Sequence, residues 1–159
     1  MYFIISFVIL WQMSLSAESN QILYFSPGFS ISLDIKGNIL FSPKISFGLY
    51  KNMQFINITL GRVSSSSEGN SYYYIEPQIG SLSKPLEYRK IQIFYGLGLG
   101  IAYLDDNKND KIAFRGSLFT GFGLFLNASF LIGRELNTDL GIQAVLPIPL
   151  NKDGYGPIN

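Results

Sequence analysis

The sequence predicts an all-β fold: a closed, antiparallel, up-and-down β-barrel of about eight strands that spans a membrane. In residues 88–103, large apolar side chains alternate with small or polar ones, and a period of two is that of an extended strand. The charged fraction is 14%, whereas typical soluble domains have about 25%. The chain after residue 20 divides into an even number of such segments, as in the smallest bacterial membrane barrels.

The stretch 88–103 has two unlike faces. Its apolar face carries Ile91, Ile93, Tyr95, Leu97, Leu99, Ile101 and Tyr103. Its thin face carries Gln92, Phe94, Gly96, Gly98, Gly100 and Ala102. Glycines at alternate positions would cost a helix about 1 kcal/mol each, but in a strand they leave one face nearly bare, which suits the interior of a narrow barrel. We interpret the apolar face as facing lipid.

Composition limits the possible functions. The chain has 159 residues, enough for one domain, and its formal net charge of +1 does not indicate a nucleic-acid partner. It contains no cysteine and no histidine. A disulfide framework and a thiolate metal site are therefore excluded, and the commonest general base and metal ligand is missing. No catalytic triad or dyad of the common kinds can be built, so we expect no enzymatic activity, no cofactor and no metal.

Residues 1–17 resemble a secretory signal peptide. Residues 2–11 are apolar except for Ser6, and small residues precede a cleavage site predicted near Ala17. No Lys or Arg precedes the apolar block, which departs from the usual pattern. An uncleaved anchor helix is the alternative, but a membrane span needs about 20 apolar residues. The predicted barrel domain is 18–150, followed by a flexible tail at 151–159.

The first half of the barrel is predicted from alternation and turn residues. The four expected strands are residues 21–35, 39–50, 54–63 and 71–82. Gly37-Asn38 and Lys51-Asn52 are turn signals between them. Pro77 lies inside the fourth segment, where it cannot donate a ladder hydrogen bond, so we expect a bulge there.

The second half contains the other four expected strands. These are residues 88–103, 111–125, 128–135 and 139–150. The apolar run 130–132 hides the alternation in the seventh segment. Residues 116–133 contain no charge, so a transmembrane helix is an alternative for them. Four glycines in this stretch and the alternation up to Phe125 favour strands.

The connections differ in length and polarity. Residues 64–70 and 105–110 form longer, very polar loops, whereas the connections at 51–52, at 83–87 and around Asn127 are mostly short. Longer loops on one side and short turns on the other are typical of membrane barrels. We therefore expect both long loops on the same side, where an extracellular partner could bind. The first connection, at 37–38, is an exception because it is short.

Four charged residues share the parity of the thin face: Asp34, Lys44, Glu76 and Arg115. Buried charges must pair in so small a space, so we predict structural ion pairs among them, with a transport or ligand role as the alternative. Eight strands leave an interior that side chains just fill, so no through-pore is expected. Several tyrosines lie near segment ends: Tyr50, Tyr72, Tyr73, Tyr88 and Tyr103. They indicate either membrane interfaces or strand propensity alone.

The signal-like start, the eight alternating segments, the Gly96-Leu-Gly-Leu-Gly100 strand and the polar loops together resemble small outer-membrane β-barrel proteins of Gram-negative-type bacteria. This resemblance implies a monomer in the outer membrane, in contact with lipid and with its loops outward. The chain departs from the family because it ends in Gly-Pro-Ile-Asn and not in an aromatic residue. We expect a structural or surface-interaction role; the alternative is a secreted, soluble β-barrel that binds a small apolar ligand.

Overall fold

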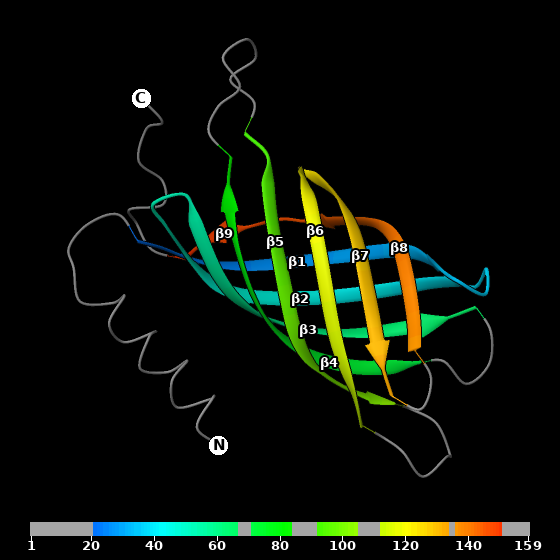
Figure 1. Ribbon diagram of the computed structural model, residues 1–159. Helices are drawn as coiled ribbons and strands as arrows, with labels where there is room; N and C mark the ends of the chain where they lie inside the picture. The colour runs from blue at the N-terminus through cyan, green and yellow to red at the C-terminus, as the bar shows by residue number, and fades with distance from the viewer. Residues whose placement is uncertain (1–20, 67–70, 84–91, 105–111, 134–135, 151–159) are drawn as a thin grey trace.

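The computed structural model describes residues 21–66, 71–83, 92–104, 112–133 and 136–150. Within these residues the chain forms one antiparallel sheet (Figure 1). Its strands are β1 (Ile22–Asp34), β2 (Ile39–Lys51), β3 (Gln54–Ser65), β4 (Tyr72–Leu82), β5 (Phe94–Leu104), β6 (Ile112–Phe122), β7 (Leu124–Ile132), β8 (Leu136–Val145) and the two-residue β9 (Ile148–Pro149). The predicted signal peptide and tail lie outside the described residues.

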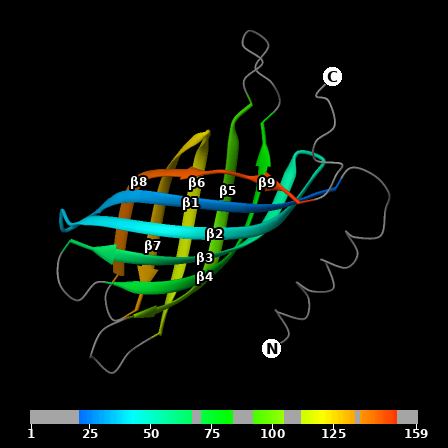
Figure 2. The ribbon, with the colours of Figure 1, turned by 180° about the vertical axis from the view of Figure 1, so that it is seen from behind.

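The sheet closes on itself through β1. Ile31 of β1 pairs with Phe41 of β2 on one side and with Ile142 of β8 on the other. Consecutive strands pair around the rest of the wall, and β9 continues the edge of β8 along β1. Figures 1 and 2 show the resulting barrel from opposite sides. The prediction of a closed, eight-stranded, antiparallel barrel is confirmed.

Alternation sets which side chains face the lumen and which face outward. On β5, the side chains of Leu97, Leu99 and Ile101 are 42%, 50% and 56% exposed, whereas Ala102 is 2% exposed. The same alternation of exposed and buried residues runs along the other long strands. The face assignment made from residues 88–103 is therefore correct for the part of that stretch that the structure describes.

Three turns contain residues with a left-handed backbone. Asn52 and Met53 have positive φ angles of 50° and 64° between β2 and β3, as a two-residue type I′ hairpin requires. Gly37 and Gly123 have φ angles of 82° and 73° in the β1–β2 and β6–β7 turns. The β6–β7 turn was expected around Asn127, which instead lies inside β7.

The strands favoured over a helix for residues 116–133 are confirmed, since this stretch contains the end of β6 and all of β7. Two other expectations about the strands are wrong. Pro77 causes no bulge, because the β3–β4 register is continuous through it and the β4–β5 register is unchanged on either side. The eighth segment begins earlier, at Leu136, and the pairing with β1 passes from β8 to the short β9 around residues 146–147.

No helix in the described part of the chain is long and apolar enough to cross a membrane.

The connections alternate between the two ends of the barrel. We call the end where β1 begins and β9 lies the terminal end, and the opposite one the distal end (Figure 1). The connections after β1, β3, β5 and β7 leave the distal end, so residues 64–70 and 105–110 are on the same side, as expected. Residues 83–93 connect β4 to β5 at the terminal end and form the longest connection. The predicted contrast between short and long ends is therefore wrong at this connection.

Candidate functional site in the barrel lumen

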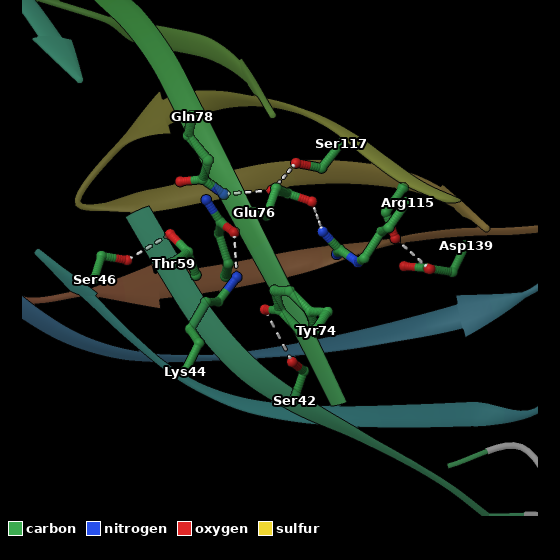
Figure 3. Close-up of polar contacts among 12 residues, drawn as sticks. Ser42, Lys44, Ser46, Thr59, Tyr74, Glu76, Gln78, Arg115, Ser117 and Asp139 are labelled. Carbon is green, nitrogen blue, oxygen red and sulfur yellow. Dashed lines mark hydrogen bonds and ion pairs between the residues drawn. The ribbon is translucent and has the colours of Figure 1, made fainter. Parts of the chain in front are cut away.

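The lumen is arranged in three tiers. The distal tier is an apolar cluster of Leu40, Val63, Tyr72, Tyr74, Ala102 and Ala113. The terminal tier is an aromatic cluster of Phe55, Phe119 and Phe125. Between them lies a polar belt of charged, amide and hydroxyl side chains, shown in Figure 3. A wall built by alternation thus encloses a lumen that is polar in the middle and apolar towards both ends.

Glu76 and Arg115 form the charged centre of the polar belt. Glu76 is 0% exposed and Arg115 is 5% exposed. Arg115 Nη1 donates to Glu76 Oε2, while Ser117 Oγ and Gln78 Nε2 both donate to Oε1 at 2.6 Å. The Arg115 guanidinium also lies 4.1 Å from the centre of the Tyr74 ring. Charge pairing, hydrogen bonds and a cation–π contact therefore compensate for the burial of both ions.

Lys44 lies in the same belt but has a neutral partner. Its Nζ donates to Gln143 Oε1 at 2.5 Å, and no carboxylate of the described residues is within ion-pair distance of it. The nearby acids have other partners: Glu76 binds Arg115, and Asp139 accepts a hydrogen bond from Ser129. The structure therefore brings Lys44 into the lumen without giving it an ion pair.

Asp34 has a different role from the one predicted. It is the last residue of β1, and its carboxylate accepts hydrogen bonds from the backbone N–H groups of Lys36 and Asn38 at 2.9 Å and 2.8 Å. The Asn38 side-chain amide adds a third, at 2.9 Å. Asp34 thus holds the β1–β2 turn at the distal end and does not join the central cluster. Asp-x-x-Gly-Asn is a turn signature that could have revealed this.

Sequence reasoning missed Asp139. Asp139 directly precedes the outward-facing Leu140, so alternation turns the Asp139 side chain inward. There it accepts a hydrogen bond from Ser129, its partner in the β7–β8 pairing. This partner could be found only with the correct β7–β8 register, which the misplaced β6–β7 turn obscured.

The glycines on the thin face do not leave empty space, because rings from neighbouring strands cover them. A Cβ added to Gly61 would lie 2.4 Å from the Tyr74 ring. The corresponding distances are 2.3 Å from Gly80 to the Phe55 ring and 2.5 Å from Gly96 to the Phe119 ring. Aromatic rings packed on glycines are a recognised device for fixing strands in curved sheets. They also narrow the lumen near both ends of the barrel.

One space in the lumen lies at the terminal end. It is a cavity of about 420 Å³ between the strand-end residues Ile22 and Pro149 and the polar belt. Phe55, Phe94, Phe119, Phe125 and Val145 form its walls. Lys44 and Gln143 line its inner end.

The outer wall is apolar between two sets of polar or aromatic side chains. Arg62, Tyr73 and Tyr103 are aligned across β3, β4 and β5 near the distal end, and the Arg62 guanidinium lies 5.2 Å from the centre of the Tyr73 ring. Tyr95, eight residues before Tyr103, is exposed near the terminal end. Eight residues cover about 27 Å along a strand. At the usual strand tilt this corresponds to about 20 Å across the membrane, slightly less than the height of a barrel's apolar band, which is about 25 Å.

These positions separate two kinds of tyrosine. Tyr73 and Tyr103 face outward where a membrane interface is expected. Tyr72 is buried in the distal cluster and Tyr50 lines the terminal cavity, so neither lies in an outer aromatic belt. Tyr88 is outside the described residues.

The outward apolar wall also decides between the two arrangements considered for the sequence. A soluble barrel turns its apolar face inward, whereas every long strand here exposes large apolar side chains on the outside. An open surface of this kind is stable in lipid and not in water. The chain has the fold of a small outer-membrane β-barrel. Its wall is transmembrane and contacts lipid.

Comparisons with known proteins agree with this fold. No family model matches the sequence, and no curated protein matches it. The crystal structure of the outer-membrane enzyme PagL is similar, with a TM-score of 0.63, 10% identity, and coverage of 77% of this chain and 99% of that one. Neisserial surface protein A matches with a TM-score of 0.49, 13% identity, and coverage of 80% and 97%. A de novo designed transmembrane β-barrel matches with a TM-score of 0.47 and 12% identity, and the match covers 77% of this chain and 95% of the designed one. At such identities, the PagL likeness concerns the fold alone.

Proposed function

We propose that the protein is a monomer of the bacterial outer membrane with a closed lumen and a structural or surface-interaction role. The observation that supports it best is the filled middle of the barrel: Glu76 and Thr59 are both 0% exposed. Apolar clusters lie on either side of this layer. A path for ions through this layer would have to break the buried Glu76–Arg115 pair and displace the side chains that pack around it.

Conductance in planar lipid bilayers tests the closed lumen. We expect the purified barrel to insert without stepwise current increases, whereas a general porin in the same bilayer conducts. Stable unitary conductance that depends on the amount of inserted protein would contradict the proposal. A Glu76→Gly/Arg115→Gly variant serves as a matched control, because removing both side chains opens the central layer.

The surface role rests on the two polar loops at the distal end. We infer that this end faces the outside of the cell, so residues 64–70 and 105–110 are available to an extracellular partner. Protease sites inserted into each loop should be cut in intact cells, and a site at Asn52-Met53 should be cut only after the membrane is opened. Cleavage of the Asn52-Met53 site alone in intact cells would show that the barrel has the opposite orientation.

We further propose that this barrel is not an enzyme, although PagL, which it resembles in fold, is one. The chain has no histidine or cysteine, and the buried Ser117 hydroxyl already donates to Glu76, which is itself paired with Arg115. A serine in this setting has no free base to take its proton. Incubation of the purified barrel with outer-membrane lipids should leave their masses unchanged.

A further inference from the structure

The terminal cavity changes in chemistry along its length. Its outer part is bounded by Ile22 and Pro149, and its middle by phenylalanine rings and Val145. Its inner end presents the Lys44 ammonium and polar side chains that include Asn57. Gly28, which pairs with Lys44, follows Ile22 by six residues, or about 20 Å along the strand. The cavity is thus a deep, largely apolar space with a cation at its inner end.

Lys44 is the residue of this cavity whose charge and N–H donors a ligand could satisfy. It is buried, with 8% of its surface exposed, and an ammonium has three N–H donors. Among the described residues only the neutral Gln143 oxygen accepts a hydrogen bond from it. An isolated buried cation is costly, and an anion beside it offsets much of that cost. The nearby acids do not contact this ammonium directly: Glu76 is paired with Arg115, and Asp139 accepts a hydrogen bond from Ser129.

We propose that this cavity binds a single-chain amphiphile with an anionic head group, of which a fatty acid is the simplest. The head group would accept hydrogen bonds from Lys44 Nζ, and the chain would lie between the phenylalanine rings towards Ile22 and Pro149. The volume of about 420 Å³ is within the usual range for small-molecule sites, about 300–1,000 Å³. The inner end is closed by the Glu76–Arg115 layer, so the site binds its ligand without forming a channel.

The chemistry of the site predicts the order in which related amphiphiles bind. Decanoate, decanol and decyltrimethylammonium share a chain and differ in head-group charge. Native mass spectrometry of the unmodified barrel, released from a neutral sugar detergent, should show a saturable one-to-one complex with decanoate. Decanol should bind about ten- to a hundredfold more weakly, because it lacks a charged hydrogen bond, and the cationic compound should bind more weakly still.

Substitutions separate the head-group contact from the apolar walls. Lys44→Met should remove the preference for decanoate over decanol, whereas Lys44→Arg should retain it. Lys51→Met, at the end of the same strand, is the matched control and should behave like the unmodified protein. Val145→Trp should weaken decanoate and decanol alike, since it fills the part of the cavity that the chain would occupy.

Three results would overturn the proposal. These are the absence of any saturable decanoate complex, equal affinity of the unmodified barrel for decanoate and decanol, and an unchanged preference in Lys44→Met. The first two comparisons use only the unmodified protein, so they decide the matter even if a variant fails to fold. Failure here would leave the closed-barrel proposal intact, because conductance tests that separately.

Discussion

The outward and inward faces of the wall follow different rules, although the same strands build both. On β5, Leu99 faces outward and is half exposed, while its neighbour Gly98 lies against Glu76 in the lumen. The outer face tolerates almost any apolar shape, because lipid adapts to it, but it excludes charge. The inner face holds charge, provided that each ion is partnered, and its packed central layer tolerates little added volume.

The comparison of the two faces also explains why glycine is needed on the inner one. From the sequence, Gly98 indicated only a nearly bare face of the strand. In the structure, a Cβ at Gly98 would lie 2.2 Å from Glu76 Oε1 and 2.6 Å from its carboxyl carbon. The thin face is thin because larger side chains from neighbouring strands need the space.

The largest effect is expected from breaking the central ion pair on the inner face. Arg115→Met leaves the Glu76 carboxylate buried without its cation, and should destabilise the barrel by about 3–5 kcal/mol. Glu76→Gln should also destabilise it. Urea unfolding in lipid vesicles would measure both.

The double variant sharpens this test. Replacing both charges removes the unpaired ion, so Glu76→Gln/Arg115→Met should lose less than the sum of the single losses. Additivity of the two losses within about 0.5 kcal/mol would mean that the two side chains do not interact.

Charge on the outer face should have the next largest effect. Leu99 lies midway between Tyr95 and Tyr103, so Leu99→Arg places a cation near the centre of the bilayer and should cost about 2–4 kcal/mol. Tyr103→Arg, on the same face but near the interface, should cost about 0–1 kcal/mol. Unfolding of both variants in the same vesicles gives the comparison. Equal losses would show that the apolar band is wrongly placed along β5.

A smaller effect is expected from adding one methyl group to each face. Gly98→Ala presses on a carboxylate fixed by Arg115, Ser117 and Gln78, so it should cost about 1–3 kcal/mol.

The outer counterpart is Gly116→Ala, where the added Cβ would meet the Phe130 ring at 2.1 Å. That ring lies on the lipid side and can swing away, so we expect a loss below about 1 kcal/mol. If Gly116→Ala were the more damaging of the two, the proposed difference in tolerance between the faces would be wrong.

Much of the wall could be predicted from the sequence because alternation is a local property. Residues such as Leu97 and Ala102 show their faces without knowledge of any partner strand. Parity also placed Lys44, Glu76 and Arg115 inside. Which of these charges meet depends on register, and register depends on turns that the sequence marked unevenly. Gly37-Asn38 was clear, whereas Gly123 lies within an uncharged run that hides the turn.

The contacts in the lumen could not be predicted for a further reason. Glu76 and Arg115 come from β4 and β6, which are not neighbours, and they meet across the intervening β5 only because Gly98 and Gly100 leave room. Such contacts depend on the diameter and tilt of the closed barrel. The terminal cavity has the same origin, since its lining comes from strands at both ends of the sequence.

Spin-label accessibility along the wall tests the central claim most directly: the apolar face meets lipid and the polar face is enclosed. The chain has no native cysteine, so single labels can be placed at Leu97→Cys, Leu99→Cys and Ile101→Cys outside and at Ala113→Cys and Ser117→Cys inside. In lipid vesicles we predict strong relaxation by oxygen and little by a water-soluble nickel chelate at the three outer positions. The two inner labels should be immobilised and reached poorly by either. High oxygen accessibility at Ala113 and Ser117, with the chelate reaching Leu97, Leu99 and Ile101, would contradict the account.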